Sequence, residues 1–229
     1  MNSCELRNKS YIEMTEQAKE NQIYSITEAV SEVKKNAKAK FDESVEVHFR
    51  LDIDPKKSDQ QVRGVADLPH GTGKSVKIVV FTTTQKKEAE AAGAELVGGE
   101  ELIDKIKSTG KIDADVAIAT PEMMPKLATI AKILGPKGLM PNPKNQTVTP
   151  KVKEVIEALK KGRADFKNDN SGNLHQAIGK VSFDGALLEE NFKALLEAVR
   201  KAKPEGAKGK FLKSVAICST MGKSVRVNF

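Results

Sequence analysis

The sequence predicts an α/β protein of two domains: a discontinuous α+β domain, whose antiparallel sheet comes from both chain ends, and an inserted α/β domain. Three observations lead to this prediction. Near both ends apolar and polar residues alternate, which is typical of strands with one buried face. In the middle, short apolar strands alternate with helices, which is typical of a parallel sheet covered on both faces. Glycine-containing segments separate these regions, and the expected boundaries are 1–71 and 163–229 for the first domain and 72–162 for the inserted one.

The composition excludes several classes of protein. The chain has 229 residues and a net charge of +7, from 38 basic and 31 acidic side chains. No run approaches the roughly 20 apolar residues that a bilayer span needs, so we expect no membrane association. The two cysteines, Cys4 and Cys218, are too few for a disulfide scaffold. Because the N-terminus has no apolar signal segment, the expected location is the cytoplasm.

The first part of the chain is expected to form one helix and one strand after a frayed polar arm, residues 1–24. Ser25-Ile26-Thr27-Glu28 has the pattern of a capping box, which predicts a helix that ends near Lys38. Residues 54–64 are expected to be a loop. Apolar residues at every second position predict a strand with one wet face: Val45, Val47, Phe49, Leu51 and Ile53.

The middle of the chain predicts strands and helices in alternation, joined by right-handed crossovers. Residues 76–81 are almost wholly apolar, as in a strand that is covered on both faces. Pro121 suits the first turn of a helix. The other expected elements are a helix at 86–92, a strand at 94–97, a helix at 101–107, a strand at 115–119, a Gly- and Pro-rich loop at 135–150 and a helix at 151–161.

The last part of the chain returns to the alternating pattern. Two strands, 163–168 and 174–183, are expected to form a hairpin around residues 170–173. A helix at 187–202 has its apolar residues at helical spacing. Strands at 211–218 and 224–229 are expected on either side of a turn at Thr220-Met221-Gly222.

The sequence contains no catalytic constellation, cofactor site or metal site. Gly71-Thr72-Gly73-Lys74-Ser75 resembles the end of a phosphate-binding loop, but Leu68 occupies the position of its first glycine, and a strand rather than a helix follows. We therefore interpret this segment as a crossing between the domains. The three histidines are scattered, and the cysteines lack metal-ligand spacing. A phosphate-ester enzyme that uses Lys74 is the rival hypothesis, and a protein-interaction adaptor is a third.

Two basic clusters indicate a polyanionic partner. An ordinary solvated surface is the alternative, because lysines near the C-terminus of a helix also complement its dipole. If the chain ends pack together, the two clusters are expected to form one face. They consist of Lys34, Lys35, Lys38 and Lys40, and of Arg200, Lys201, Lys203, Lys208, Lys210, Lys213, Lys223 and Arg226.

Two apolar side chains beside these clusters are candidates for packing against RNA. Phe41 follows Lys40 at a helix-to-strand junction, where it could instead belong to the core. Met221 lies in a tight turn, which could also be an ordinary hairpin turn. Ser219 and Thr220 offer hydroxyl groups for ribose, and backbone donors near Gly222 are expected to contact sugars because a glycine permits close approach.

At these residues the sequence resembles a known family, the bacterial large-subunit ribosomal proteins of the mobile side stalk (the L-one family). The resemblance covers the chain from about residue 25 to the end. One departure is Lys223, which stands where the family commonly has proline; it is expected to loosen the turn and add a phosphate contact. The matching stretches, of which GPKGLMPNPK is long and unusual, are residues 40–46, 62–74, 134–144 and 219–226.

The resemblance implies a fold and a function. The inserted domain would be a Rossmann-like three-layer α/β domain. The protein would be a non-catalytic ribosomal protein without a cofactor, cytoplasmic and ribosome-bound, and monomeric when free. It would bind large-subunit ribosomal RNA at the stalk, assist the release of deacylated tRNA from the exit site and repress translation of its own operon by binding the mRNA. The implied RNA-binding residues are Lys40, Phe41, Ser44, Lys167, His175, Ser214, Thr220, Met221 and Gly222.

Overall fold

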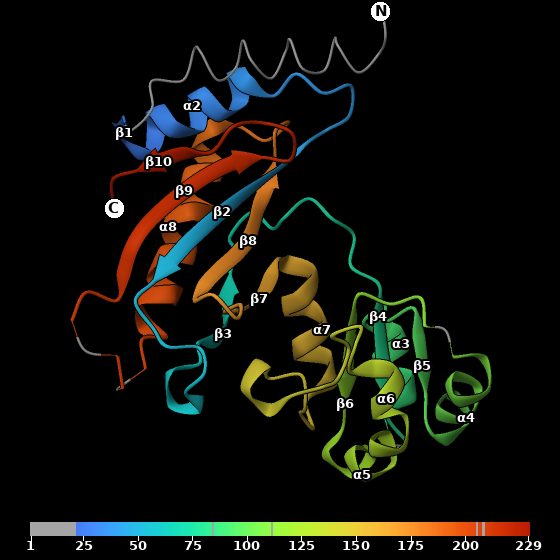
Figure 1. The fold of residues 1–229 in the computed structure, drawn as a ribbon. Helices are drawn as coiled ribbons and strands as arrows, with labels where there is room; N and C mark the ends of the chain where they lie inside the picture. The colour runs from blue at the N-terminus through green and yellow to red at the C-terminus, as the bar shows by residue number, and fades with distance from the viewer. Residues whose placement is uncertain (1–21, 84, 111, 205, 208) are drawn as a thin grey trace, which may run out of the picture. The chain divides into compact units, whose positions relative to one another are not determined.

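The structure is a computed structural model that describes residues 22–229 except residues 84, 111, 205 and 208. It is a mixed α/β structure with several sheets (Figure 1). Its contacts divide the chain into two compact units. Unit 1 comprises residues 1–73 and 166–229, and unit 2 comprises residues 74–165. The predicted domain boundaries at 71/72 and 162/163 stay a prediction, and each unit is described by itself.

A five-stranded sheet in unit 1 combines strands from both parts of the chain. Its order is β1-β10-β9-β2-β8, with β1 parallel to β10 and the other neighbours antiparallel. Along β2, the buried residues alternate with more exposed ones, as the apolar pattern predicts. The strands are β1 (Ile23–Tyr24), β2 (Ser44–Leu51), β8 (Asn173–Lys180), β9 (Leu212–Ser219) and β10 (Val225–Val227).

Two helices, α2 (Ile26–Asn36) and α8 (Gly185–Lys201), pack against each other and against this sheet. The predicted capping box of α2 is confirmed: the Ser25 side chain accepts a hydrogen bond from the Glu28 amide, and the Glu28 carboxylate accepts one from the Ser25 amide. In Figure 1, α8 runs behind β9, β2 and β8. Among the described residues, no helix covers the face of these strands that is turned to the viewer.

A second sheet, which the sequence did not predict, contains two strands, β3 (Arg63–Asp67) and β7 (Arg163–Lys167). The expected hairpin between residues 163–168 and 174–183 is wrong, because β7 pairs with β3 while β8 pairs with β2. A single bridge, between Asn168 and Leu174, joins the two segments at their turn. The expected loop at 54–64 contains a 3-10 turn, η1 (Ser58–Gln60), and the first residues of β3.

Unit 2 contains a parallel sheet of order β5-β4-β6 with helices on both faces. One face packs against α3 (Lys86–Ala91) and α7 (Val152–Lys161), and the other against α4 (Glu100–Thr109), α5 (Met124–Leu127) and α6 (Ala131–Leu134). The helix expected near Pro121 is instead a series of short turns, in which η2 (Pro121–Met123) and η3 (Ala128–Ile130) precede α5 and α6. The strands are β4 (Ile78–Phe81), β5 (Leu96–Gly98) and β6 (Val116–Ala119), and a further 3-10 turn is η4 (Pro143–Asn145).

The N-terminal arm is only partly described. Residues 1–21 of the arm that was expected to be frayed lie outside the described residues. Ile23 and Tyr24, in contrast, form β1 and pair with Arg226 and Val227 of β10, so the expected arm ends in a strand. In the part of the chain that the structure describes, no helix has the length and apolar character needed to cross a bilayer.

Candidate nucleic-acid interface

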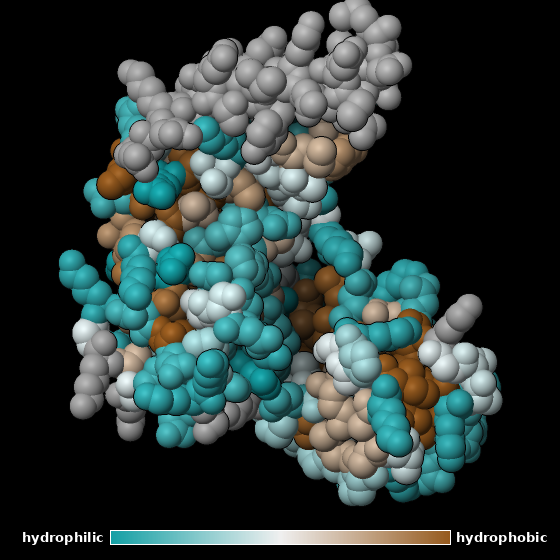
Figure 2. All heavy atoms as spheres, viewed as in Figure 1, coloured by the Kyte–Doolittle hydropathy of each residue, from teal (hydrophilic) through white to brown (hydrophobic). Residues whose placement is uncertain are grey.

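The uncovered face of β2, β8 and β9 carries the polar half of the strand pattern. On β2 this half consists of Ser44, Glu46, His48 and Arg50, and the alternating Val45, Val47, Phe49 and Leu51 are buried. Figure 2 shows that the surface over β2, β8 and β9 is largely hydrophilic. A polar sheet face without a covering helix is open to a hydrated partner such as RNA.

The two predicted apolar contacts lie at one end of this face. Phe41 is 56% exposed and Met221 is 66% exposed, so neither is a core residue. The Ser44 amide donates to Thr220 Oγ1 at 3.0 Å, and the Thr220 amide donates to the Ser44 carbonyl at 3.1 Å. These bonds bring the two distant segments together. We call the group formed by Lys40, Phe41, Ser44, Thr220, Met221 and Gly222 the β2–β9 cluster.

The backbone amides of Met221 and Gly222 in this cluster already have hydrogen-bond partners within the protein. The Gly222 amide donates to the Ser219 carbonyl at 3.1 Å, and the Met221 amide donates to Glu43 Oε2 at 3.0 Å. Ser219 is buried, and its hydroxyl lies where a side chain at position 222 would begin, which explains the glycine. The expectations that these backbone donors and the Ser219 hydroxyl face sugars are therefore wrong, whereas Thr220 is exposed.

The other predicted residues lie away from this cluster. Exposed His175 on β8 and exposed Ser214 on β9 lie along the same sheet, opposite His48 and Arg50 of β2 respectively. Ser44 and Arg50 are six residues apart on β2, a span of about 20 Å. Lys167 is exposed but belongs to β7 in the two-stranded sheet. The structure therefore gathers six of the predicted residues, places two further along the sheet and puts one on another sheet.

The two basic clusters do not merge as a whole. Lys40 lies just before β2, where the Ala39 and Met221 amides both bind the Glu43 carboxylate. Lys213 instead pairs with Asp52 at 2.8 Å, beyond the opposite end of β2. Because α8 ends at Lys201 and β9 begins at Leu212, the segment between them reaches that far end of the sheet. Lys223 of the same cluster, in contrast, directly follows Gly222, and Lys208 lies outside the described residues. The expectation of one continuous basic face is therefore wrong for Lys213.

A chain of polar contacts, not expected from the sequence, occupies the middle of the outward face. His48 Nδ1 lies 2.8 Å from His175 Nδ1, and His48 Nε2 lies 2.9 Å from Cys218 Sγ. Because these contacts use opposite nitrogens of the His48 ring, one metal ion could not bind all three side chains. Among the described residues, no group of three or more His, Cys, Asp or Glu side chains is arranged to hold a metal ion.

This chain of contacts is expected to make stability depend on pH. Burial and the neighbouring His175 ring lower the pKa of His48 below 6.5, and the Glu46 carboxylate opposes this shift. Because the pKa of His48 is lower in the folded state than in the unfolded state, the unfolded chain takes up a proton at a higher pH than the folded one. The folded state therefore has its full stability above about pH 6.5 and loses part of it as the pH falls towards the folded-state pKa. We expect the free energy of unfolding, measured by urea titration, to fall less between about pH 7.5 and about pH 5.5 in His48→Gln than in the wild type. An equal fall in both proteins would contradict this.

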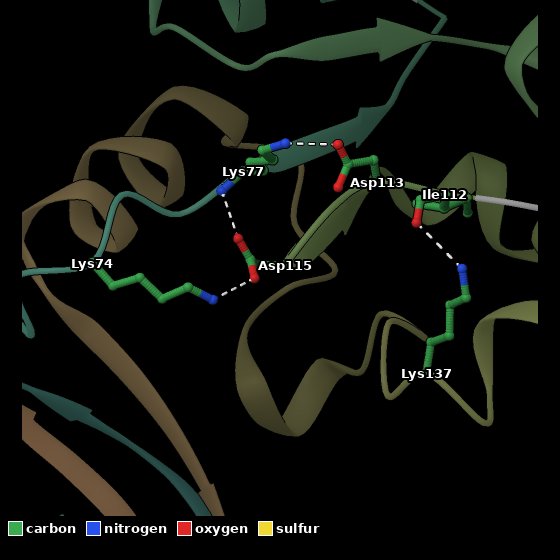
Figure 3. A network of polar contacts seen from close by, with 6 residues as sticks. All are labelled: Lys74, Lys77, Ile112, Asp113, Asp115 and Lys137. Carbon is green, nitrogen blue, oxygen red and sulfur yellow. Dashed lines mark hydrogen bonds and ion pairs between the residues drawn. The ribbon is translucent and has the colours of Figure 1, made fainter. Parts of the chain in front are cut away.

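The segment that resembles a phosphate-binding loop has a structural role instead. Lys74 Nζ lies 2.6 Å from Asp115 Oδ1, and Asp115 Oδ2 accepts a hydrogen bond from the Lys77 amide at 3.1 Å (Figure 3). Lys77 Nζ in turn pairs with Asp113 at 2.6 Å. These contacts hold the chain just before β4, so the glycines precede a strand and open no helix. Lys74 therefore lacks the context of a phosphate-binding loop.

Sequence reasoning missed two residues that hold the β2–β9 cluster together. Lys180 Nζ donates to Ser44 Oγ at 2.9 Å. Glu43 is 1% exposed and lies directly before β2. One signal was available: Glu43 occupies the position before Val45 in the every-second-residue series of buried positions, where an acidic residue requires partners.

Comparisons with known proteins agree on one family. The model of the ribosomal protein L1p/L10e family matches residues 33–223. A "Large ribosomal subunit protein uL1" from Mycoplasma capricolum subsp. capricolum is 48% identical over 221 residues, which cover 96% of this chain and 98% of that protein. A protein with the same description from Kosmotoga olearia is 50% identical over 223 residues, 97% of this chain and 96% of that protein. The chain therefore belongs to the ribosomal protein L1p/L10e family.

Proposed function

We propose that this chain is a non-catalytic protein of the large ribosomal subunit that binds ribosomal RNA at the mobile stalk through the β2–β9 cluster. The observation that carries the proposal is the pair Phe41 and Met221, both largely exposed, on segments that hydrogen bonds hold side by side. Apolar side chains on a rigid polar surface suit unstacked bases and the faces of folded RNA. The descriptions of the relatives as large-subunit proteins support the assignment to that subunit.

Four of the six members of the cluster have a specific role in this proposal, and Ser44 and Gly222 are proposed RNA-binding residues to which no specific contact is assigned. Phe41 packs its ring on a base or ribose, and Lys40 beside it neutralises a phosphate. Thr220 offers its hydroxyl to a 2′-OH, and Met221 fills the space next to Phe41. His175 and Ser214 extend the contact along the sheet, and Lys167 reaches the RNA only if the RNA extends past the turn between β7 and β8.

The remaining functions follow from the family resemblance. We propose that the protein assists the release of deacylated tRNA from the exit site and represses translation of its own operon by binding its mRNA. In this proposal the protein is cytoplasmic and ribosome-bound, monomeric when free, and contains the discontinuous domain (1–71 and 163–229) and the Rossmann-like domain (72–162). We also propose a hinge at the chain crossing between these domains. The Gly71 carbonyl before the crossing is bound by Asn191, and Lys74 after it pairs with Asp115, so bending is expected at the residues between them.

A titration of the wild-type protein with a stalk fragment of large-subunit ribosomal RNA, monitored by filter binding, tests the main proposal. If about four phosphates are neutralised, the affinity should fall about a hundredfold between about 50 mM and about 200 mM salt. An absence of RNA affinity together with turnover of a nucleotide would instead favour the phosphate-ester enzyme. An absence of both would favour the protein-interaction adaptor.

A further inference from the structure

The β2–β9 cluster is assembled around one buried carboxylate. Glu43 is 1% exposed, although it lies only two residues after the exposed Phe41 and directly before the first residue of β2. Its Oε1 accepts a hydrogen bond from the Ala39 amide at 3.0 Å, and its Oε2 accepts one from the Met221 amide at 3.0 Å. The two oxygens therefore hold two segments that are far apart in the sequence.

The Glu43 backbone fixes the same carboxylate to a third segment. Its carbonyl accepts a hydrogen bond from the Val181 amide at 2.9 Å, directly after β8. The neighbouring Asp42 accepts hydrogen bonds from the Ser182 amide at 3.2 Å and from the Ser182 hydroxyl at 2.9 Å. The chain after Phe41 is thus fixed to the end of β8. The chain before Phe41 is fixed by the hydrogen bond from the Ala39 amide to the Glu43 carboxylate.

Glu43 remains ionised in this environment. Burial raises its pKa, but the Met221 amide, the nearby Ser219 hydroxyl and the Ala39 amide together lower the pKa by more, so that it lies below 4.5. Hydrogen bonds from amides to a charged acceptor are about twice as strong as neutral ones. A neutral amide side chain at this position would offer only one accepting oxygen, and its NH₂ group would face one of the two donors.

We infer that Glu43 is a positioning residue, which joins the Lys40–Phe41 segment and the Thr220–Met221–Gly222 turn into one RNA-binding surface without touching the RNA itself. This inference rests on the proposed function. Nothing else among the described contacts of these segments connects the Ala39 backbone to the turn. Without the carboxylate, the bonds between Ser44 and Thr220 remain, but the Ala39–Phe41 part of the loop loses its link to the turn. RNA must then restore the position of the Phe41 ring at the expense of affinity.

The test compares Glu43→Gln with Glu197→Gln, a matched loss of one negative charge at an exposed position of α8. With the stalk fragment of large-subunit ribosomal RNA as the probe, we expect Glu43→Gln to weaken binding about tenfold, as the loss of a charged hydrogen bond predicts, and Glu197→Gln to bind like the wild type. The slope of log affinity against log salt should stay unchanged in Glu43→Gln, because no phosphate contact is lost.

A positioning role also predicts a result that a purely structural role does not predict. In a Phe41→Ala background, Glu43→Gln should weaken binding much less than it does in the wild type, because the ring that it positions is absent. Strictly additive effects would overturn the inference. Equal affinity of Glu43→Gln and the wild type would also overturn it while leaving the proposed function intact, and a wild type that binds no RNA would remove the proposed function and the inference together.

A measurement on the wild type decides the question if Glu43→Gln does not fold. Amide hydrogen exchange should show protection of Ala39 and Met221, whose amides bind the carboxylate. The adjacent Lys40 amide, which makes no such carboxylate bond, is the comparison, since the Thr220 and Gly222 amides bind backbone carbonyls. Rapid exchange of the Ala39 and Met221 amides would contradict the proposed clamp, and protection of both would support it.

Discussion

Replacement of Asn191 by leucine is expected to lower the free energy of unfolding of unit 1 by about 3 kcal/mol. Asn191 lies on α8 and is fully buried. Its Nδ2 donates to the Gly71 carbonyl at 2.9 Å and to the Ile178 carbonyl at 2.8 Å, and its Oδ1 accepts from the His70 amide at 3.1 Å. Leucine has a similar volume but makes none of these bonds, so up to three backbone groups lose their partner at a cost of about 1–3 kcal/mol each.

The prediction is checked by urea titration, with hydrogen exchange of the α8 and β8 amides to observe unit 1 separately from unit 2. The matched control is Asn228→Leu, the same change at an exposed position after β10, which should shift stability by less than about 0.5 kcal/mol. A loss below about 1 kcal/mol in Asn191→Leu would mean that water replaces the amide at little cost.

Phe41→Ala is expected to weaken RNA binding by about tenfold to a hundredfold, because the removal of an aromatic ring from a stacked base costs about 1–3 kcal/mol. The ring is 56% exposed, so its loss should change the free energy of unfolding little. The measurement is a filter-binding titration with the stalk fragment of large-subunit ribosomal RNA, accompanied by urea titration of the same preparations.

Phe229→Ala provides a control of the same residue type, since Phe229 is 41% exposed and lies after β10, away from the β2–β9 cluster. It should bind RNA like the wild type. If Phe41→Ala binds as tightly as Phe229→Ala, RNA does not contact the Phe41 ring, and the interface lies elsewhere on the protein.

Periodicity predicted most elements, because it reports which side of an element meets the core. The alternating residues from Val45 to Leu51 correspond to β2, and the apolar run that ends at Phe81 corresponds to β4. Strand β3 was missed because its buried position, Ala66, lies among Gly64 and charged residues, and the strand exists only through its pairing with β7. The wrong hairpin has the same origin: a turn at residues 170–173 does not reveal which strand its neighbours pair with.

The candidate site was predicted in part. Phe41 and Met221 were open alternatives in the sequence, since a single apolar residue at a junction or in a turn can be core or surface. The His48–His175–Cys218 chain was invisible because its members are far apart in the sequence and meet only through the register of β8, β2 and β9. The expected merger of the basic clusters is wrong for Lys213, because strand direction places Lys213 at the opposite end of β2 from Lys40.

The sequence by itself determined the family and the alternation of elements, because motif identity and local periodicity depend only on neighbouring residues. It also determined that the uncovered face of β2 is polar, since every second residue of a strand points the same way. Only the tertiary structure decided that Glu43 joins Ala39 to Met221 and that Asn191 holds His70, Gly71 and Ile178. A buried polar side chain finds its partners in segments that are distant along the chain, and their proximity exists only once the strands have paired.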